Sequence, residues 1–428
     1  MVLARFAAIR PFAVRECAAP PDVAEAFSMA RRAAQPVAVR SDGHCFAGRS
    51  STTGVVIDVR PMSGVEVDGD RAEIGAGSRL AEVYAALAGH GRTIAAGCGP
   101  TVGISGLTLG GGLGILGRRH GLTCDQLLAA TLVLPDGRVT EADDDLLWML
   151  RGGGAPGVVT SLVFRTVPAP DSTAFRLVFP ARAAAAVLDA WQACLPALDD
   201  AMAPSLVITA PDAGDPVVTV FGAGPSDAAV DDLIGRLGVR PLSDERYHGS
   251  HPQVKQWLSA DADRPDPHRT DPHRTDPNPA DPHQADPSPA DPNPADRNWA
   301  YLHSEFFRDL VPAERLIARL EADRRPGEER ELDFSPWGGA YNRVAAGATA
   351  FPHRDARFLL KQTATVAPGE RPGPWLDDSF ALTRPYGTGG AYPNFPDPTL
   401  ATEEPYYLGN TARRARVRAR YDPEGIVA

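Results

Sequence analysis

The chain has 428 residues, enough for two or three domains, and its 43% of apolar residues can form a sizeable core. Its net charge of −11 argues against a nucleic-acid partner, because binding a phosphate backbone requires a basic face. No apolar run reaches the roughly 20 residues of a membrane span, and residues 1–14 lack a signal-peptide pattern. The five cysteines are few and irregularly spaced, which predicts a cytoplasmic protein without disulfides or a metal site.

Short strands alternate with helices over residues 1–170, which is typical of an α+β or α/β unit. Residues 22–34 have apolar side chains at helical spacing, and Asp22 is the expected N-cap. The turn residues Pro135-Asp136-Gly137 predict a hairpin over 130–139. We further expect strands at 36–39, 54–59, 73–76 and 158–164, and a helix over 79–89.

A second α+β domain with an antiparallel sheet is expected from residue 171 onward. Strand-like runs at 175–179, 205–209 and 217–221 are separated by helical runs at 182–197 and 228–237. Near the C-terminus, a group of closely spaced arginines predicts the solvated face of a helix. These arginines are Arg413, Arg414, Arg416, Arg418 and Arg420.

Residues 266–295 repeat a five-residue unit that begins with Asp-Pro. Proline at every fifth position prevents a helix or a paired strand, and the unit offers no apolar side chain for burial. We expect a disordered insertion over 262–297 with polyproline character. A metal site built from its histidines is the less favoured alternative. These histidines are His268, His273 and His283.

Two glycine-rich segments carry the chemical signals. The first, residues 40–48 (RSDGHCFAG), follows an expected strand, so its backbone N–H groups suit either a diphosphate or a structural turn. The second, residues 97–114, has eight glycines in eighteen residues, which fits a main chain that runs close along a cofactor. Its spacing is not that of a nicotinamide-dinucleotide fingerprint.

Taken in order, these motifs resemble the berberine-bridge-enzyme-like oxidoreductases of the vanillyl-alcohol-oxidase (PCMH-type) superfamily. The resemblance implies a two-domain α+β fold. Residues 1–170 would form a PCMH-type FAD-binding domain and residues 171–385 a substrate domain built on an antiparallel sheet. Residues 386–428 would form a C-terminal segment that returns to the FAD-binding domain. The matching stretches are DGH (42–44), GVVIDV (54–59), AGCGPTVGISGLTLGGGLGILGRRHGLTCDQL (96–127), LPDGRV (134–139), HSEFFRDL (303–310), SPWGGAYNRV (335–344), AFPHRDARFLL (350–360) and AYPNFPD (391–397).

By the same resemblance, His44 is the residue that bonds covalently to the flavin. A second covalent bond is not expected, because Gly99 holds the position of the family's attaching cysteine and Cys98 lies one residue early. Val102 matches a position that admits dioxygen, which favours an oxidase. The implied cofactor-binding residues are Arg40, Ser41, Asp42, Gly43, His44, Cys45, Gly48, Thr101, Val102, Gly103, Gly106, Leu107, Gly110, Gly111, Gly112, Gly114, Asp125, Val159 and Asn394.

The sequence leaves more than one candidate for the catalytic base. The family often uses the second tyrosine of a Tyr-x-Asn-Tyr motif, but residue 395 is phenylalanine here. The remaining candidates for the base are Tyr392, Tyr341 and Tyr386. His353 is a less favoured candidate. A tyrosine starts from a pKa of about 10, so a nearby positive charge would have to lower it.

The expected activity is FAD-dependent oxidation of a small alcohol, sugar or secondary metabolite, with dioxygen as acceptor. Two alternatives stay open: a flavin dehydrogenase with another acceptor, and a flavin-free or inactive relative that only binds its ligand. Asp42, Phe395 and the expected shortening of both termini relative to the family motivate the second alternative. A carboxylate at Asp42 would repel a diphosphate unless it turns away.

Overall fold

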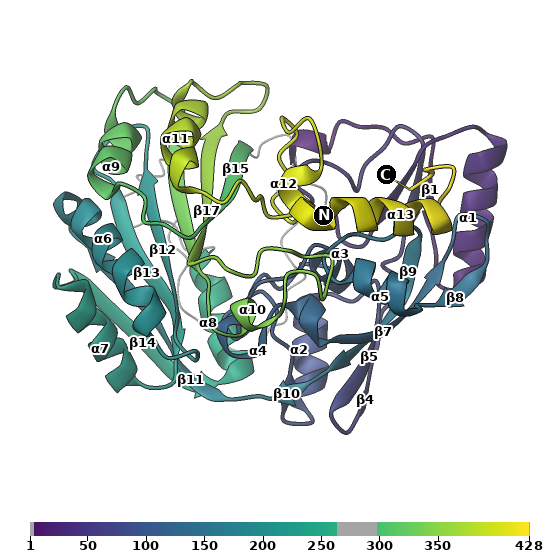
Figure 1. Cartoon of the computed structure of the whole chain (residues 1–428), viewed down its shortest axis with the longest axis horizontal. Coiled ribbons are helices and arrows are strands. Elements are labelled where there is room, and N and C mark those ends of the chain that lie inside the picture. The colour runs from purple at the N-terminus through teal and green to yellow at the C-terminus, as the bar shows by residue number, and fades with distance from the viewer. Residues whose placement is uncertain (1–3, 263–297, 428) are drawn as a thin grey trace, which may run out of the picture.

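The computed structural model describes residues 4–262 and 298–427, so the Asp-Pro repeat, with His268, His273 and His283, lies outside the described residues. Two groups of sheets lie side by side along the long axis of the molecule (Figure 1). One group contains the N-terminal elements and the C-terminal helix, and the other contains a large antiparallel sheet covered by helices. Within the described ranges, no helix is long and apolar enough to cross a membrane.

The N-terminal part has two main sheets that enclose one apolar core. A parallel sheet has the order β1-β3-β2, an antiparallel sheet has the order β4-β5-β9-β7-β8, and β6 pairs with β10. The strands are β1 (Ala13–Glu16), β2 (Val37–Arg40), β3 (Val55–Asp58), β4 (Val65–Asp68), β5 (Arg71–Gly75), β6 (Arg92–Thr93), β7 (Leu127–Val133), β8 (Val139–Glu141), β9 (Val158–Arg165) and β10 (Val167–Pro168). The helices are η1 (Ala4–Phe6), α1 (Pro20–Arg32), α2 (Leu80–Ala88), α3 (Ile104–Leu109), α4 (Gly117–His120), η2 (Thr123–Gln126) and α5 (Asp144–Leu150).

Local sequence signals place these elements well, with one correction. The expected hairpin forms between β7 and β8, and Gly137 adopts the left-handed φ of 88° that the turn requires. The predicted N-cap role of Asp22 is wrong, because α1 already begins at Pro20. Asp22 lies in the first turn instead, where its carboxylate accepts the backbone N–H groups of Ala18 and Ala19.

The second part is built on a seven-stranded antiparallel sheet in the order β14-β11-β13-β12-β16-β17-β15, as the sequence predicts for an α+β domain. Burial alternates along its central strands, because α6, α7, α9 and α11 pack on one face while the other face stays partly exposed. The strands are β11 (Asp171–Phe179), β12 (Ala203–Ala210), β13 (Val217–Gly224), β14 (Ser243–Ser250), β15 (Trp299–Phe307), β16 (Glu329–Pro336) and β17 (Phe358–Val366). The helices are η3 (Ala181–Ala183), α6 (Ala184–Cys194), η4 (Leu195–Ala197), α7 (Asp227–Leu237), α8 (His251–Ala262), α9 (Ala313–Glu321), α10 (Ala340–Arg343), α11 (Trp375–Thr383) and η6 (Arg384–Tyr386).

The C-terminal segment runs back over the N-terminal part (Figure 1). It contains α12 (Glu404–Tyr407), η7 (Leu408–Asn410) and α13 (Thr411–Tyr421), and Val427 forms a bridge with Val37 of β2. The expected solvated arginine face is wrong at one position. Arg414 is buried, donates to the Gly153 carbonyl and pairs with Glu403, because α13 lies against the N-terminal part. The predicted domain boundaries themselves stay a prediction.

Candidate active site

The turn after β2 and the glycine-rich segment before α3 lie against each other. The Nε2 atom of His44 is 3.0 Å from Oγ1 of Thr101. A Cβ atom added to Gly103 would lie 1.8 Å from Oγ of Ser41, so this close approach requires glycine. The His44 side chain is 32% exposed. The two predicted segments therefore form one site that contains an accessible imidazole.

Asp42 of the same turn is paired with Arg79, the residue before α2. Nε and Nη2 of Arg79 both donate to its Oδ1 atom, at 2.9 and 2.7 Å, and Nε2 of His44 lies 3.3 Å from its Oδ2 atom. Burial by itself would raise the pKa of Asp42, but the hydrogen bonds with His44 and Arg79 outweigh burial and lower that pKa. The carboxylate is thus held ionised and paired, which removes the main repulsion expected beside a diphosphate. Sequence reasoning missed Arg79, which lies 37 residues away.

Three serine hydroxyls around this turn are buried without a hydrogen-bond partner in the described structure. They belong to Ser41, Ser50 and Ser51. Buried hydroxyls without partners are costly, and hydroxyl groups donate readily to phosphate oxygens. Gly43, with φ of 91°, adds the kind of turn in which backbone N–H groups cradle an anion. The residues present therefore fit the diphosphate of a dinucleotide such as FAD.

The other predicted residues of the turn have structural contacts as well. Nε of Arg40 donates to the Ser50 carbonyl at 3.1 Å, and Cys45 is half-buried. Gly48, with φ of 70°, lies against the ring of Phe6, where any Cβ atom would clash. Arg40 and Gly48 therefore help to fix the shape of the turn.

The glycine-rich segment divides into two halves. In its first half, Val102 and Leu107 are half-buried and Gly106 is exposed with open space above it, which leaves room for a ligand. In its second half, the glycines lie against other parts of the protein. A Cβ atom would meet Asn394 at Gly110, the Phe351 and Tyr392 rings at Gly111, Thr123 at Gly112 and the Ala96 backbone at Gly114.

Tyr392 and Asn394 attach the C-terminal segment to these glycines. Nδ2 of Asn394 donates to the Leu107 carbonyl at 2.9 Å, and the Tyr392 hydroxyl accepts the Gly112 N–H at 3.0 Å. The sequence separation of 280 between Tyr392 and Gly112 hid this contact from sequence reasoning. Both side chains position the main chain on which a cofactor would rest.

The candidate bases are poorly suited to accept a proton. Burial raises the pKa of both Tyr392 and Tyr341 well above the usual value, which keeps the two phenols protonated. Tyr386 packs on the helix-covered face of the large sheet, so the structure corrects its expected place at the site. Burial lowers the pKa of His353 to about 3, and its Nε2 atom contacts the Tyr406 carbonyl.

Asp125 and Val159 lie deeper in the protein. The Asp125 carboxylate binds both terminal nitrogens of Arg354, at 2.7 and 2.8 Å, and accepts the Leu122 N–H. Val159 is buried in the core of the N-terminal part. Their expected cofactor contacts stay a prediction.

Lys255 is a further residue that sequence reasoning missed. This buried lysine of α8 donates to the Gly97 carbonyl at 2.9 Å and to the Tyr84 hydroxyl at 3.1 Å, and it also donates to the Ala96 carbonyl. Lys255 therefore links the second part of the chain to the start of the glycine-rich segment.

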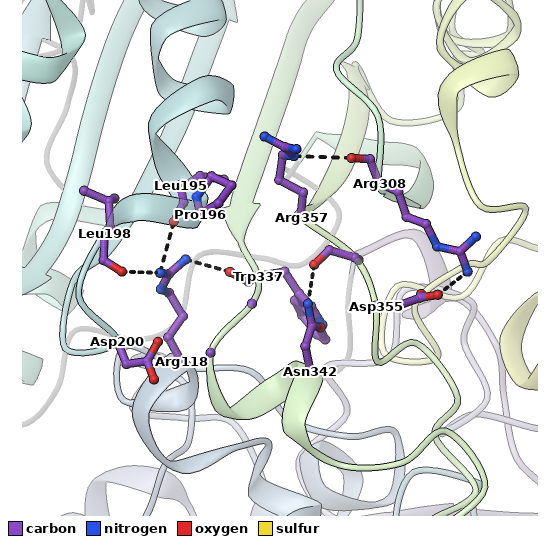
Figure 2. Close-up of a pocket in the computed structure, with 13 residues that line it drawn as sticks. Arg118, Leu195, Pro196, Leu198, Asp200, Arg308, Trp337, Asn342, Asp355 and Arg357 are labelled. Carbon is purple, nitrogen blue, oxygen red and sulfur yellow. Dashed lines mark hydrogen bonds and ion pairs between the residues drawn. The ribbon is translucent and has the colours of Figure 1, made fainter.

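A cavity of about 240 Å³ lies apart from this site (Figure 2). Arg118 donates there to the carbonyls of Leu195, Leu198 and Trp337, and Arg308 pairs with Asp355. None of the residues predicted for cofactor binding or catalysis lines this cavity. Among residues 4–262 and 298–427, no group of three or more His, Cys, Asp or Glu side chains could hold a metal ion.

Comparison with known proteins relates the chain to FAD-linked oxidoreductases. A model of FAD binding domains matches residues 11–143, and a model described as berberine and berberine like matches residues 391–426. The chain is 31% identical over 428 residues to the FAD-linked oxidoreductase YvdP of Bacillus subtilis (strain 168), covering 95% of this chain and 88% of YvdP.

Solved structures share the fold. The structure of BBE-like #28 from Arabidopsis thaliana has a TM-score of 0.81 at 22% identity, covering 100% of this chain and 93% of that one. Glucooligosaccharide oxidase from Acremonium strictum, described with a 6-S-cysteinyl, 8α-N1-histidyl FAD, has a TM-score of 0.79 at 22% identity, covering 97% and 90%. The chain therefore belongs to the berberine-bridge-enzyme-like family of FAD-linked oxidoreductases, with a PCMH-type FAD-binding domain and a berberine-bridge-enzyme-like C-terminal domain.

Proposed function

We propose that this oxidoreductase is an oxidase that holds FAD through one covalent bond to His44. The observation that carries the proposal is the placement of that imidazole. Its Nε2 atom faces Thr101 and Asp42, which leaves Nδ1 as the ring nitrogen available to the flavin. The partnerless hydroxyls of Ser41, Ser50 and Ser51 supply donors for the diphosphate.

A single attachment is proposed because the second position lacks a thiol. Residue 99 is glycine, and Cys98 packs in an apolar cluster with Val254 and Leu258 of α8. The doubly linked flavin described for glucooligosaccharide oxidase is thus not expected here.

The substrate is proposed to lie against the half-exposed face of the large sheet, opposite His44 and Val102. A small alcohol, sugar or secondary metabolite is the expected class. FAD supplies the acceptor for the hydride when bound, and dioxygen would then accept the electrons and yield hydrogen peroxide. Valine at position 102 supports access of dioxygen, because its side chain is small and half-buried. The free cysteines support a reducing, cytoplasmic setting.

Intact-mass spectrometry tests the attachment. The purified wild type should exceed its polypeptide mass by one FAD, whereas His44→Ala should lack the increment. His90→Ala, which removes an exposed histidine, should keep the increment and serves as the control. A wild type with the bare polypeptide mass would refute covalent attachment, and a colourless wild type would favour the flavin-free alternative.

The electron acceptor is tested separately. Once a substrate that reduces the flavin is found by anaerobic screening, the reduced protein is mixed with air-saturated buffer. Rapid return of the oxidised spectrum with stoichiometric peroxide is expected of an oxidase. Reoxidation that needs an added quinone or dye would instead support the dehydrogenase alternative.

A further inference from the structure

Two acidic residues and one lysine form a charged group on the half-exposed face of the seven-stranded sheet. Nζ of Lys361 is 2.9 Å from Oδ2 of Asp333 and 3.4 Å from Oε1 of Glu331. The three side chains are 17% (Lys361), 21% (Asp333) and 31% (Glu331) exposed. The three side chains are thus partly withdrawn from water.

Strand register places this charged group next to the candidate active site. Lys361 lies directly opposite both Ser304 of β15 and Asp333 of β16, so the three residues form one row across the sheet. Oγ of Ser304 accepts the backbone N–H of Tyr392 at 3.2 Å. The row therefore borders the turn that holds Tyr392 and Phe395.

Two aromatic rings extend from the charged group toward His44, the proposed site of flavin attachment. The ammonium of Lys361 lies 5.4 Å from the centre of the Phe395 ring, and that ring meets Phe46 edge-on at 5.7 Å. Phe46 follows His44 by two positions. A ligand between the sheet and the flavin site would meet the carboxylates and these two rings together.

The charges of the group do not cancel. Two carboxylates face one ammonium, and no second cation of the described residues lies within 4.0 Å of either carboxylate. Burial opposes the charge on Lys361, but Asp333 and Glu331 outweigh burial, raise its pKa and keep it cationic. One negative charge is therefore left over in a partly desolvated place, where a matching cation is favoured.

We propose that Asp333 and Glu331, spaced by Lys361, form a subsite for a protonated amine on the substrate, a proposal that rests on the oxidoreductase function above. A neutral polyol could satisfy the hydrogen bonds of the carboxylates but would leave their excess charge uncompensated. The amine that binds here need not be the group that is oxidised. The aromatic rings of Phe395 and Phe46 suit an aryl or ring-bearing amine.

The test uses three probes with one ring and different charge: benzylamine, benzyl alcohol and benzoate. Each is titrated into the purified holoprotein near pH 7, and dissociation constants are read from the change in the flavin absorbance spectrum. Benzylamine, which is cationic at this pH, should bind about tenfold more tightly than benzyl alcohol, and benzoate should bind most weakly.

Matched variants identify the residues responsible. Asp333→Asn and Glu331→Gln should each weaken benzylamine binding about tenfold and leave benzyl alcohol within about twofold. Asp232→Asn removes one charge from α7, on the covered face, and should change neither constant. If one acidic variant fails to fold, the other supplies the same comparison.

Equal affinity of the wild type for benzylamine and benzyl alcohol would overturn the subsite, as would equal losses for both probes in the variants. Tighter binding of benzoate would also overturn it. A colourless preparation would count against the proposed function instead. Isothermal titration calorimetry measures the dissociation constants of the three probes without a flavin signal. The preference for a cationic probe can therefore be tested independently of the flavin.

Discussion

The guanidinium of Arg79 binds the carboxylate of Asp42 through two nitrogen atoms, and it does so inside the turn that carries His44. Asp42 is 3% exposed, and a buried carboxylate needs a cationic partner. Its pairing with Arg79 therefore allows an acidic residue to lie beside a turn that is proposed to bind an anion. The proposed cofactor site and its unusual aspartate are therefore compatible.

Arg79→Met should leave the buried Asp42 carboxylate without its main cationic partner. We expect the free energy of unfolding, measured with urea, to fall by about 2 kcal/mol, with lower flavin content. Adding Asp42→Asn to this variant should recover most of the loss, because the uncompensated charge is then removed. If the two substitutions lowered the free energy of unfolding additively, the proposed dependence of Asp42 on Arg79 would be contradicted.

His303 should make stability depend on pH. Its Nδ1 and Nε2 atoms lie 2.5 Å from Asp397 and 3.0 Å from Asp377, and its ring stacks on Phe380. Burial alone would lower the pKa of His303, but the hydrogen bonds with both carboxylates outweigh burial and raise it. The stabilisation is therefore complete below the unfolded pKa of about 6.5 and is lost as pH rises through the folded value.

Urea unfolding of the wild type and His303→Gln at pH 6 and pH 9 tests this dependence. The difference in stability between the two proteins should be larger at pH 6. Asp397→Asn should remove most of the effect, whereas Asp377→Asn should remove less, because the Asp377 side chain is 84% exposed and its charge is screened. A difference independent of pH would contradict the assignment.

Glu305→Gln should stabilise the protein at alkaline pH. Burial raises the pKa of Glu305 to about 7, while Oε1 accepts the Gly389 N–H, a contact that glutamine keeps. A raised carboxyl pKa favours folding below the unfolded value of about 4.3, and this benefit is lost as pH rises toward 7. The variant should therefore gain at most about 3 to 4 kcal/mol relative to wild type at pH 8.

Thermal or urea unfolding at pH 5 and pH 8 measures this change. Leu310→Gln, an exposed substitution near the same strand, should show no such pH-dependent gain and controls for surface effects. A Glu305→Gln protein that is less stable at pH 8 would show that the ionised carboxylate is required.

Tyr392→Phe should affect structure more than proton transfer. Removal of the hydroxyl leaves the buried Gly112 N–H unsatisfied, so unfolding free energy should fall by about 1 to 2 kcal/mol. Since burial keeps this phenol protonated, kcat should fall less than about tenfold with an unchanged pH profile. A loss of about a hundredfold or more would identify Tyr392 as the base, and Tyr386→Phe serves as the control.

The sequence by itself determined the local features of this protein. The β7–β8 hairpin and helix α1 follow from turn chemistry and apolar spacing, and the glycine-rich segments follow from composition. These signals depend on residues that are close together in the chain, so they can be recognised in a single sequence. Even there, the exact start of α1 escaped prediction, because two prolines moved the helix start ahead of Asp22.

Only the tertiary structure decided which distant residues meet at the site. Arg79 neutralises Asp42, Tyr392 satisfies Gly112, and Lys361 lies between two carboxylates of a neighbouring strand. The physical reason is that sheet register pairs Lys361 with Asp333, and the packing of loops against the sheets brings the other groups together, while sequence separation carries no trace of either. Local chemistry thus indicated a cofactor site, and the family resemblance identified the cofactor as FAD, whereas long-range packing fixed the charges and hydrogen bonds of that site.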